Sequence, residues 1–489
     1  MSIFGENVAQ DRIFQDGAIL PRERRLSLSL KPHASSHIQI FLDAKPIGEG
    51  LYLDDHWEFA LPPMAAGGPH RLRFELDGTV ERDIEVYFGD VFLLSGQSNM
   101  QLPISRTLDA CPYDTLDDPL IRELRLPREE AWRGIAPKAS WHPLSSEHFA
   151  VFSALGAAFA IHYRQAYDVP VGLISTAIGG TPVASWLPPY HPIDLADLKQ
   201  VASIEMDAVN RWYQELEAVT EPWETLEMPT MFFDTKWEDQ QGAFELRYRF
   251  NLEHTNYDRL DLGGMIDHDV TYLNGKEIGT TGYQYPPRKY KIPEGLLNVG
   301  ENEILVRLYV QRNTGGFVPE RIYALRGAAD FSLEGAWEVR QIASQKDLPY
   351  QTFFDRMPGI NWYHFIKPLD AFPFKAILWY QGESADQETS TYQAKFTSLV
   401  KGFQKQFFAP VIFCQLPCFE DPARMVPEGS WARIRAAQEA ASRLPNCSQV
   451  VHYDISQATD LHPEDKWTLG KRVFNHVDAF LGGQDLRGP

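Results

Sequence analysis

Five short apolar segments, each followed at once by polar residues or glycines, constrain the fold of this chain more than any other feature. Continuous apolar runs of this length are typical of strands buried on both faces of a parallel sheet. They lie at 91–94, 171–174, 376–380, 411–413 and 450–453. Segments with helical spacing lie between or after them, at 149–167, 392–407, 431–444 and 463–480, and a polar, proline-rich excursion covers 102–146. The alternation predicts an α/β fold with helices on both faces of a parallel sheet.

Residues able to carry chemistry follow the ends of these predicted strands. In chain order they are Ser98, the pair Gly179-Gly180, Gln381, Glu383, Asp460 and His462. The carboxyl ends of parallel strands meet at one edge of the sheet, where open α/β folds bind their ligands. A nucleophile, a flexible backbone donor, an amide, carboxylates and a histidine would therefore converge on one crevice. That set of groups is typical of a hydrolase.

Two further regions are predicted to be rich in β-strands. Residues 1–88 combine short apolar runs with turn signals, so we expect an N-terminal β-sandwich. Residues 196–345 intervene between the second and third predicted strands, far more than an ordinary connection needs. They are expected to form a helical arm and an inserted β-sandwich, with a hairpin signalled by Asn274-Gly275. The α/β domain would then consist of 89–195 and 346–489.

Charge and composition exclude several classes of protein. The net charge of -20 at pH 7 argues against nucleic-acid binding, because such proteins usually carry a basic surface. The 4 cysteines form no Cys-x-x-Cys pair, which predicts neither a disulfide framework nor a zinc site. No metal or organic cofactor is expected.

The chain contains no apolar run long enough to span a bilayer, and its first residues lack the basic and apolar parts of a secretory signal. We therefore expect no membrane association and a cytoplasmic location, although a mature form without its leader would read the same. The oligomeric state carries no signal in the sequence.

Ser98, His462 and Asp460 have the residue types of a serine-hydrolase triad. A serine hydroxyl is a weak nucleophile and needs a base within hydrogen-bond reach. His462 precedes Pro463, which is predicted to begin the last helix, so the histidine would stand above the sheet edge. Asp460 is expected to orient the imidazole and stabilise its charged form.

Each member of this set also has an ordinary interpretation. Ser98 could simply cap a helix, His462 could be an exposed loop residue, and Asp460 could cap the last helix. Glu383 and Asp454 compete with Asp460 for the role of orienting carboxylate.

The oxyanion of an acyl-transfer reaction also has candidate donors. They are the backbone amides of Ser98 and Gly180 and the side chain of Gln381. One preplaced donor is worth roughly 3 kcal/mol of barrier lowering. Glycine lets the backbone approach a substrate closely, although a plain Gly-Gly turn would have the same sequence.

Taken together, these motifs resemble the sialate O-acetylesterase family, a branch of the SGNH hydrolases. The segments that carry the resemblance are 94–100, 179–183, 379–384 and 460–463, with 431–438 in addition. The resemblance implies an SGNH-type, flavodoxin-like parallel sheet, serine-esterase chemistry, and supporting roles for Glu383 and Arg435. It also implies a jelly-roll-like form for the inserted sandwich. The family often has glutamate where this chain has Gln101 and Ala184, and both positions bear on the substrate.

The expected function is therefore removal of acetyl groups from a carbohydrate, with O-acetylated sialic acid as substrate. Acetylated xylan or another plant oligosaccharide is the alternative substrate, and a non-catalytic sugar-binding protein is the alternative of another class. Candidate sugar-contacting aromatic residues are Tyr283, Tyr285 and Trp337, although such residues more often form a sandwich core. The sialic acid carboxylate would need an arginine near Ser98, for which Arg106 and Arg435 are candidates.

Overall fold

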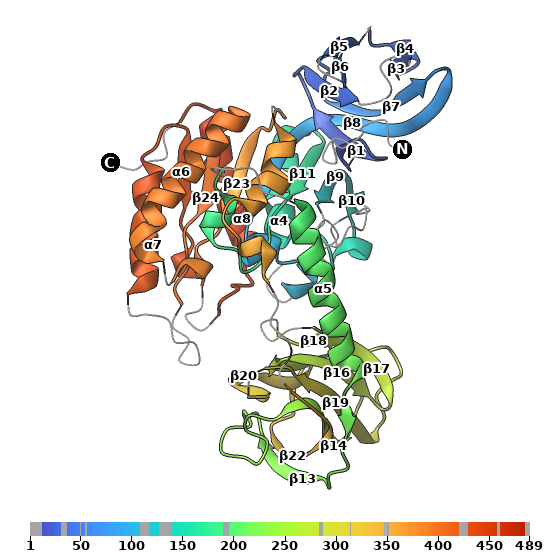
Figure 1. Ribbon diagram of the computed structural model, residues 1–489, viewed down its shortest axis with the longest axis vertical. Coiled ribbons are helices and arrows are strands. Elements are labelled where there is room, and N and C mark those ends of the chain that lie inside the picture. Colours follow the sequence, from blue (N-terminus) through green and yellow to red (C-terminus); the bar gives the residue numbers. More distant parts are fainter. Residues whose placement is uncertain are drawn as a thin grey trace. The chain divides into compact units, whose positions relative to one another are not determined.

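The computed structural model in Figure 1 describes most of the chain. The described residues are 12–30, 37–48, 50–53, 56–107, 117–126, 139–188, 195–282, 287–312, 314–346, 348, 352–370, 372–386, 388–419, 429–456 and 460–484. The chain divides into two compact units, Met1–Lys199 with Phe353–Pro489, and Gln200–Thr352. The candidate catalytic residues all lie in the first unit.

The first unit contains a largely parallel sheet. Its order is β10 (Trp141–Leu144), β9 (Asp118–Arg125), β11 (Val171–Ser175), β8 (Thr79–Gly96), β23 (Ala376–Tyr380), β24 (Val411–Cys414) and β25 (Cys447–Val450). Neighbours from β9 to β25 are parallel, whereas β10 is antiparallel to β9. The strands that contain or adjoin the five predicted runs take the order 2-1-3-4-5 of flavodoxin-like sheets. The predicted parallel α/β fold is confirmed.

Two details of the predicted sheet are wrong. The polar excursion after the first strand contributes β9 and β10. β9 was not predicted because charged residues such as Arg122 and Glu123 interrupt the apolar pattern of a buried strand. In the structure Glu123 is nevertheless buried. The fifth strand, β25, ends at Val450, where the predicted strand began. It was misplaced because a strand at the end of the order can include polar residues, here Ser448 and Gln449.

Helices cover both faces of this sheet, as predicted. They are α4 (Ala154–Tyr167), α6 (Thr389–Phe407), α7 (Ser430–Ser442) and α8 (Lys466–Leu481). Alternate residues of β23 face opposite cores. Ile377 and Trp379 belong to the core that includes residues of α6 and α7. Leu378 and Tyr380 belong to the core that includes residues of α4 and α8.

The N-terminal residues join this sheet through one long strand. The first part of β8 pairs with β1 (Ala18–Pro21) and β7 (Gly67–Leu76), and its last residues form the centre of the parallel sheet. The other strands of this region are β2 (Leu26–Leu30), β3 (Ile38–Leu42), β4 (Lys45–Pro46), β5 (Leu51–Leu53) and β6 (His56–Leu61). Position 88 falls inside β8, and one core includes both Phe74 and Leu93. A domain boundary at 88 stays a prediction.

The second unit packs two antiparallel sheets on a shared core. One has the order β12 (Glu217–Ala218), β22 (Gly335–Gln345), β14 (Gln241–Leu252), β19 (Gly300–Val310), β16 (His268–Leu273) and β17 (Lys276–Thr281), with β13 (Glu224–Met228) also on β22. The other has the order β18 (Lys289–Lys291), β15 (Tyr257–Ile266), β20 (Gly316–Gly327) and β21 (Phe331–Ser332). Leu246 and Leu262 represent the two sheets in that core. The helix α5 (Leu195–Gln214) precedes these strands in the chain.

Two sequence predictions fall in this unit. Asn274 and Gly275 join β16 to β17, both with positive φ, which confirms the predicted hairpin. Trp337 is fully buried and its indole N–H donates to the Leu333 carbonyl at 2.8 Å, so it belongs to the core. Tyr283 and Tyr285 lie outside the described residues. The jelly-roll form stays a prediction.

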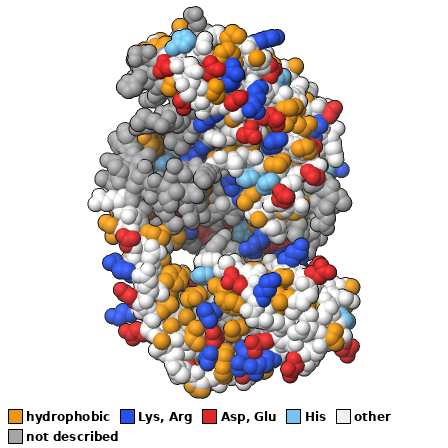
Figure 2. Space-filling view, turned by 90° about the vertical axis from the view of Figure 1, so that its right-hand side faces the viewer, with side chains coloured by type: hydrophobic (Ala, Val, Ile, Leu, Met, Phe, Trp, Pro, Cys, Tyr) orange, Lys and Arg blue, Asp and Glu red, His pale blue; other side chains and the backbone are white. Residues whose placement is uncertain are grey.

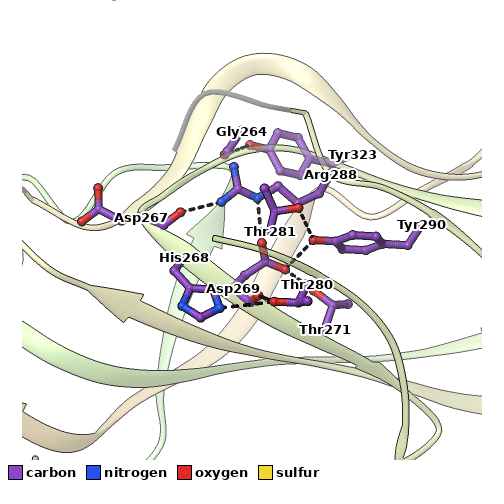
Figure 3. A network of polar contacts seen from close by, with 10 residues as sticks. All are labelled: Gly264, Asp267, His268, Asp269, Thr271, Thr280, Thr281, Arg288, Tyr290 and Tyr323. Atoms are coloured by element: carbon purple, nitrogen blue, oxygen red, sulfur yellow. Dashed lines mark hydrogen bonds and ion pairs between the residues drawn. The ribbon is translucent and has the colours of Figure 1, made fainter. Parts of the chain in front are cut away.

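A buried ion pair joins the two sheets of this unit (Figure 3). Arg288 and Asp269 are both fully buried, and the guanidinium Nε donates to Asp269 Oδ1 at 2.7 Å. The hydroxyl of Tyr290, in β18, donates to the other oxygen of Asp269, in β16, at 2.8 Å. Nη2 of Arg288 donates to the Asp267 carbonyl at 2.6 Å. Buried charges are stable only with such partners, so this network ties the sheets together.

Acidic and basic side chains are interspersed over the described part of the face drawn in Figure 2. Among the described residues, no helix combines the length and apolarity that crossing a bilayer requires.

Candidate active site

The end of β8 places Ser98 at the edge of the parallel sheet. Gly96 has φ +126°, and a Cβ built on it would lie 2.1 Å from the carbonyl oxygen of Tyr380, so only glycine lets β8 end against β23. The Gln97 N–H donates to that carbonyl at 2.8 Å. Ser98 then begins the short helix α2 (Ser98–Gln101) and is partly exposed. Its own N–H has no acceptor within the helix.

His462 lies against Ser98. Its Nε2 is 2.9 Å from Ser98 Oγ, and both side chains are partly exposed. The helix after His462 begins at Lys466, not at Pro463 as predicted, because Asp465 caps it by accepting the Thr468 N–H at 2.9 Å. The structure thus brings together the predicted nucleophile and its predicted base.

The carboxylates considered as orienting groups have different partners. Asp460 Oδ1 accepts the backbone N–H of His462 at 2.9 Å, so it shapes the histidine loop. Asp454, in η9 (Tyr453–Ile455), accepts two hydrogen bonds of 2.6 Å from Arg472 of α8. Glu383, in η8 (Glu383–Ala385), is buried. Orientation of the imidazole by Asp460 stays a prediction.

A second histidine near this edge is held neutral. Burial lowers the pKa of His452 to about 3, with a smaller contribution from the nearby charge of Lys466. Its Nε2 lies 2.8 Å from the Gln415 carbonyl, which can only accept a hydrogen bond, so this nitrogen carries the proton. His452 is therefore a buried structural histidine, in contrast to His462.

The Gly-Gly loop packs directly on Ser98. A Cβ built on Gly179 would lie 3.4 Å from Ser98 Cβ, and the Gly179 N–H donates to Gln101 Oε1 at 2.8 Å. Gly180 has φ +76° and is partly exposed, and its N–H makes no hydrogen bond to another described residue. This donor follows directly on Gly179, the residue that packs on Ser98. Gln101, one of the two departures from the family pattern, holds this loop.

Gln381 supports the same loop from a buried position. Its Nε2 donates to the carbonyl of Thr181 at 3.3 Å, and the Tyr392 hydroxyl contacts its Oε1 at 3.3 Å. The side chain of Gln438 donates to the Gln381 carbonyl at 3.0 Å. A direct role of Gln381 as oxyanion donor stays a prediction.

Sequence reasoning missed Asn99. Its Nδ2 donates to the Leu461 carbonyl at 3.0 Å. The residue after Ser98 is therefore bonded to the residue before His462. The signal available was its place in the motif at 94–100.

Sequence reasoning also missed Arg356, at the end of η5 (Phe354–Arg356). A Cβ built on Gly180 would lie 3.2 Å from its Nη2, and its guanidinium lies 4.4 Å from the ring centre of Phe353. The Gly359 N–H donates to the carbonyl of Ala184, the second departure from the family pattern, at 3.0 Å. The exposed Arg356 therefore stands on a segment bonded to the residues that follow the Gly-Gly loop.

Arg435 and Arg106, which the sequence suggested as partners of a substrate carboxylate, lie in other segments than Arg356. Arg435 donates to the Pro417 carbonyl at 2.9 Å and lies 5.3 Å from the ring centre of Tyr453, so it links the segments after β24 and β25. Arg106 ends η1 (Ile104–Arg106). Among the described residues, no three His, Cys, Asp or Glu side chains gather as metal ligands would.

The sequence matches the family model of carbohydrate esterases described as sialic acid-specific acetylesterases. The matched residues are 88–222 and 339–478, more than half of the chain and both parts of the α/β sheet. The chain belongs to this family. Ser98, His462 and the Gly-Gly loop all fall within the matched residues.

Two sequence relatives and one solved structure are similar to this chain. Sialate O-acetylesterases of Pongo abelii and Homo sapiens are each 31% identical over 147 residues, which is 27% of this chain and 28% of theirs. The chain thus matches less than a third of the length of these relatives. A carbohydrate acetylesterase from Xanthomonas citri has a similar fold, with a TM-score of 0.58 and 18% identity over 97% of this chain and 75% of that one.

Proposed function

We propose that this protein is a serine esterase that removes O-acetyl groups from carbohydrate, with O-acetylated sialic acid as its substrate. The observation that carries the proposal is the 2.9 Å contact between Ser98 Oγ and His462 Nε2. The Gly-Gly loop that packs on Ser98 supplies the N–H of Gly180 as the proposed donor. A hydroxyl, a base and a preplaced donor at one point are the requirements of acyl transfer.

In the first half of the reaction, Ser98 Oγ attacks the acetyl carbonyl carbon and His462 Nε2 takes the hydroxyl proton. The negative oxygen of the tetrahedral intermediate accepts hydrogen bonds from the N–H groups of Ser98 and Gly180, with Gln381 as a further donor. The intermediate collapses when His462 returns the proton to the sugar oxygen, which leaves as a hydroxyl group. Ser98 then carries the acetyl group.

In the second half, His462 removes a proton from water and the resulting hydroxide attacks the acetyl-enzyme. Collapse of this second intermediate returns the proton to Ser98 Oγ and releases acetate. Asp460 would stabilise the charged imidazole in both halves.

Arg356 supports an acidic sugar as substrate. Sialic acid carries a carboxylate, and a guanidinium binds a carboxylate through paired, charge-assisted hydrogen bonds. Arg356 is exposed beside Gly180, and the neighbouring Phe353 is 45% exposed. A charged donor and an apolar surface next to the Gly180 donor fit the carboxylate and the ring of such a sugar.

Acetate release from a substrate panel tests this proposal. The panel contains 4-nitrophenyl acetate, O-acetylated sialic acid and acetylated xylan, each with the wild type and with Ser98→Ala. We expect wild-type release to be fastest from sialic acid and to vanish in Ser98→Ala. Faster release from xylan would replace the substrate and keep the mechanism. Release from none of the three would contradict the esterase proposal and favour sugar binding.

A further inference from the structure

A buried charged network lies directly behind the reactive pair. Lys466 is fully buried, Glu383 is 2% exposed, and Asn99 stands between them with no exposed surface. Lys466 Nζ donates to Asn99 Oδ1 at 2.7 Å, and Asn99 Nδ2 donates to Glu383 Oε1 at 2.5 Å. The three residues come from the start of α8, from α2 and from the segment after β23.

The chemistry of these partners allows only one orientation of the Asn99 amide. An ammonium group can only donate, and a carboxylate or a carbonyl oxygen can only accept. The amide oxygen must therefore face Lys466, and its NH2 group must face Glu383 and the Leu461 carbonyl. Both protons of that NH2 group are thus committed.

The fixed orientation of the Asn99 amide affects the reacting residues through their neighbours in the main chain. Asn99 follows Ser98, and Leu461 precedes His462, so one side-chain hydrogen bond of 3.0 Å links the neighbours of the nucleophile and of the base. Lys466 and Glu383 are buried, and each is bonded to one end of the Asn99 amide, a hydrogen bond that a buried polar group needs. An arrangement of this kind is rigid, because turning the amide would leave both charges facing like partners.

We propose that Asn99 is a positioning residue, locked by Lys466 and Glu383, which holds the His462 loop at the distance from Ser98 that makes the hydroxyl reactive. This rests on the proposed function only in taking Ser98 and His462 as the reacting pair. Lys466 and Glu383 act through Asn99 and not on the substrate.

A pair of variants separates positioning from stability. Asn99→Asp adds a buried negative charge that faces Glu383 and the Leu461 carbonyl. Asn99→Asp combined with Glu383→Gln restores the net charge of the network, since the introduced carboxylate can then accept from both Lys466 and the introduced amide. The Leu461 carbonyl still meets an acceptor in that double variant. Asn99→Ala removes the link without any added charge.

The readouts are the melting temperature and the rate at which Ser98 is labelled by a fluorophosphonate, which needs an activated serine but no sugar. A matched control is Asn302→Asp in the second unit, where a buried amide donates to the carbonyls of Asn298 and Gly300 at 2.8 and 3.0 Å. That change should lower the melting temperature and leave labelling at the wild-type rate.

We expect Asn99→Asp to lower the melting temperature and to slow labelling on the order of a hundredfold, the usual effect of a displaced catalytic pair. The double variant should regain melting temperature while labelling stays slow, and Asn99→Ala should also label slowly. On 4-nitrophenyl acetate the loss should appear in kcat and not in KM.

Labelling that recovers together with melting temperature would show a merely structural role and overturn the inference. A wild-type Ser98 that is not labelled at all would overturn it together with the esterase mechanism. Normal labelling without acetate release from any sugar would overturn the proposed function alone.

Discussion

Nε2 of His462 lies 2.9 Å from Oγ of Ser98, across a sequence separation of 364 positions. The contact joins the helix that follows β8 to the loop that precedes α8. It predicts that neither residue is reactive without the other. Replacing Ser98 or His462 by alanine should lower kcat/KM for 4-nitrophenyl acetate at least about a thousandfold, and the double variant should lose little more.

Steady-state kinetics of the two single variants and the double variant check this. Ser442→Ala, in α7, is the control and should keep wild-type kinetics. Additive losses in the double variant would show that the two residues do not act as a pair.

Arg356→Gln should reduce the preference for an acidic sugar. Losing a hydrogen-bonded charge partner costs roughly 1.5–3 kcal/mol, so the ratio of kcat/KM for acetylated sialic acid to that for acetylated xylan should fall about ten- to a hundredfold. Arg249→Gln, an exposed residue of the second unit, is the control. An unchanged ratio would exclude Arg356 from substrate recognition.

Gln101 should be replaceable by glutamate but not by leucine. Its Oε1 accepts the Gly179 N–H at 2.8 Å, which sets the loop that carries the Gly180 donor. A glutamate carboxylate can accept the same bond, whereas Gln101→Leu leaves the loop without it. We expect kcat on 4-nitrophenyl acetate to fall roughly tenfold in Gln101→Leu, from a weakened oxyanion donor, and only slightly in Gln101→Glu. Equal kcat values in both variants would refute this role.

Removal of Arg288 should destabilise the second unit. Arg288→Met leaves the fully buried Asp269 carboxylate without its cation, which typically costs about 3–5 kcal/mol. Denaturant unfolding followed by tryptophan fluorescence measures the change. The control Arg249→Met breaks an exposed pair and should cost less than about 1 kcal/mol. Similar losses of unfolding free energy in both variants would show that the buried pair stabilises the protein no more than the exposed pair does.

His452 should make the protein sensitive to acid. Burial lowers its pKa to about 3 in the folded state, whereas an unfolded histidine has a pKa of about 6.5. Between these values only the unfolded chain takes up the proton, so stability falls as the pH decreases through this range. The slope from this group is at most about 1.4 kcal/mol per pH unit.

Urea unfolding at pH 7, 6, 5 and 4 tests this dependence. The free energy of unfolding of His452→Gln should fall less steeply than that of the wild type, while the exposed His37→Gln should follow the wild type. Parallel curves for all three proteins would show that His452 is not the group responsible.

Burial decided which strands could be recognised in the sequence. Runs such as 376–380 were recognised as strands because a strand covered on both faces must be apolar along its whole length. β9 and β25 were missed or displaced because strands near the ends of the order tolerate Arg122 or Ser448. The last helix was predicted to begin at Pro463 but begins at Lys466, because the side chain of Asp465 accepts the Thr468 N–H and caps it there.

The sequence by itself determined that Ser98, the Gly-Gly pair and His462 stand at strand ends, because apolar runs locate the strands and parallel strands share one edge. Only the tertiary structure decided which neighbours hold them. The hydrogen bond of Asn99 to Leu461 and the close approach of Arg356 to Gly180 involve residues far apart in the chain. Single polar contacts of this kind have no periodicity, so they arise only when packing of the apolar faces brings their elements together.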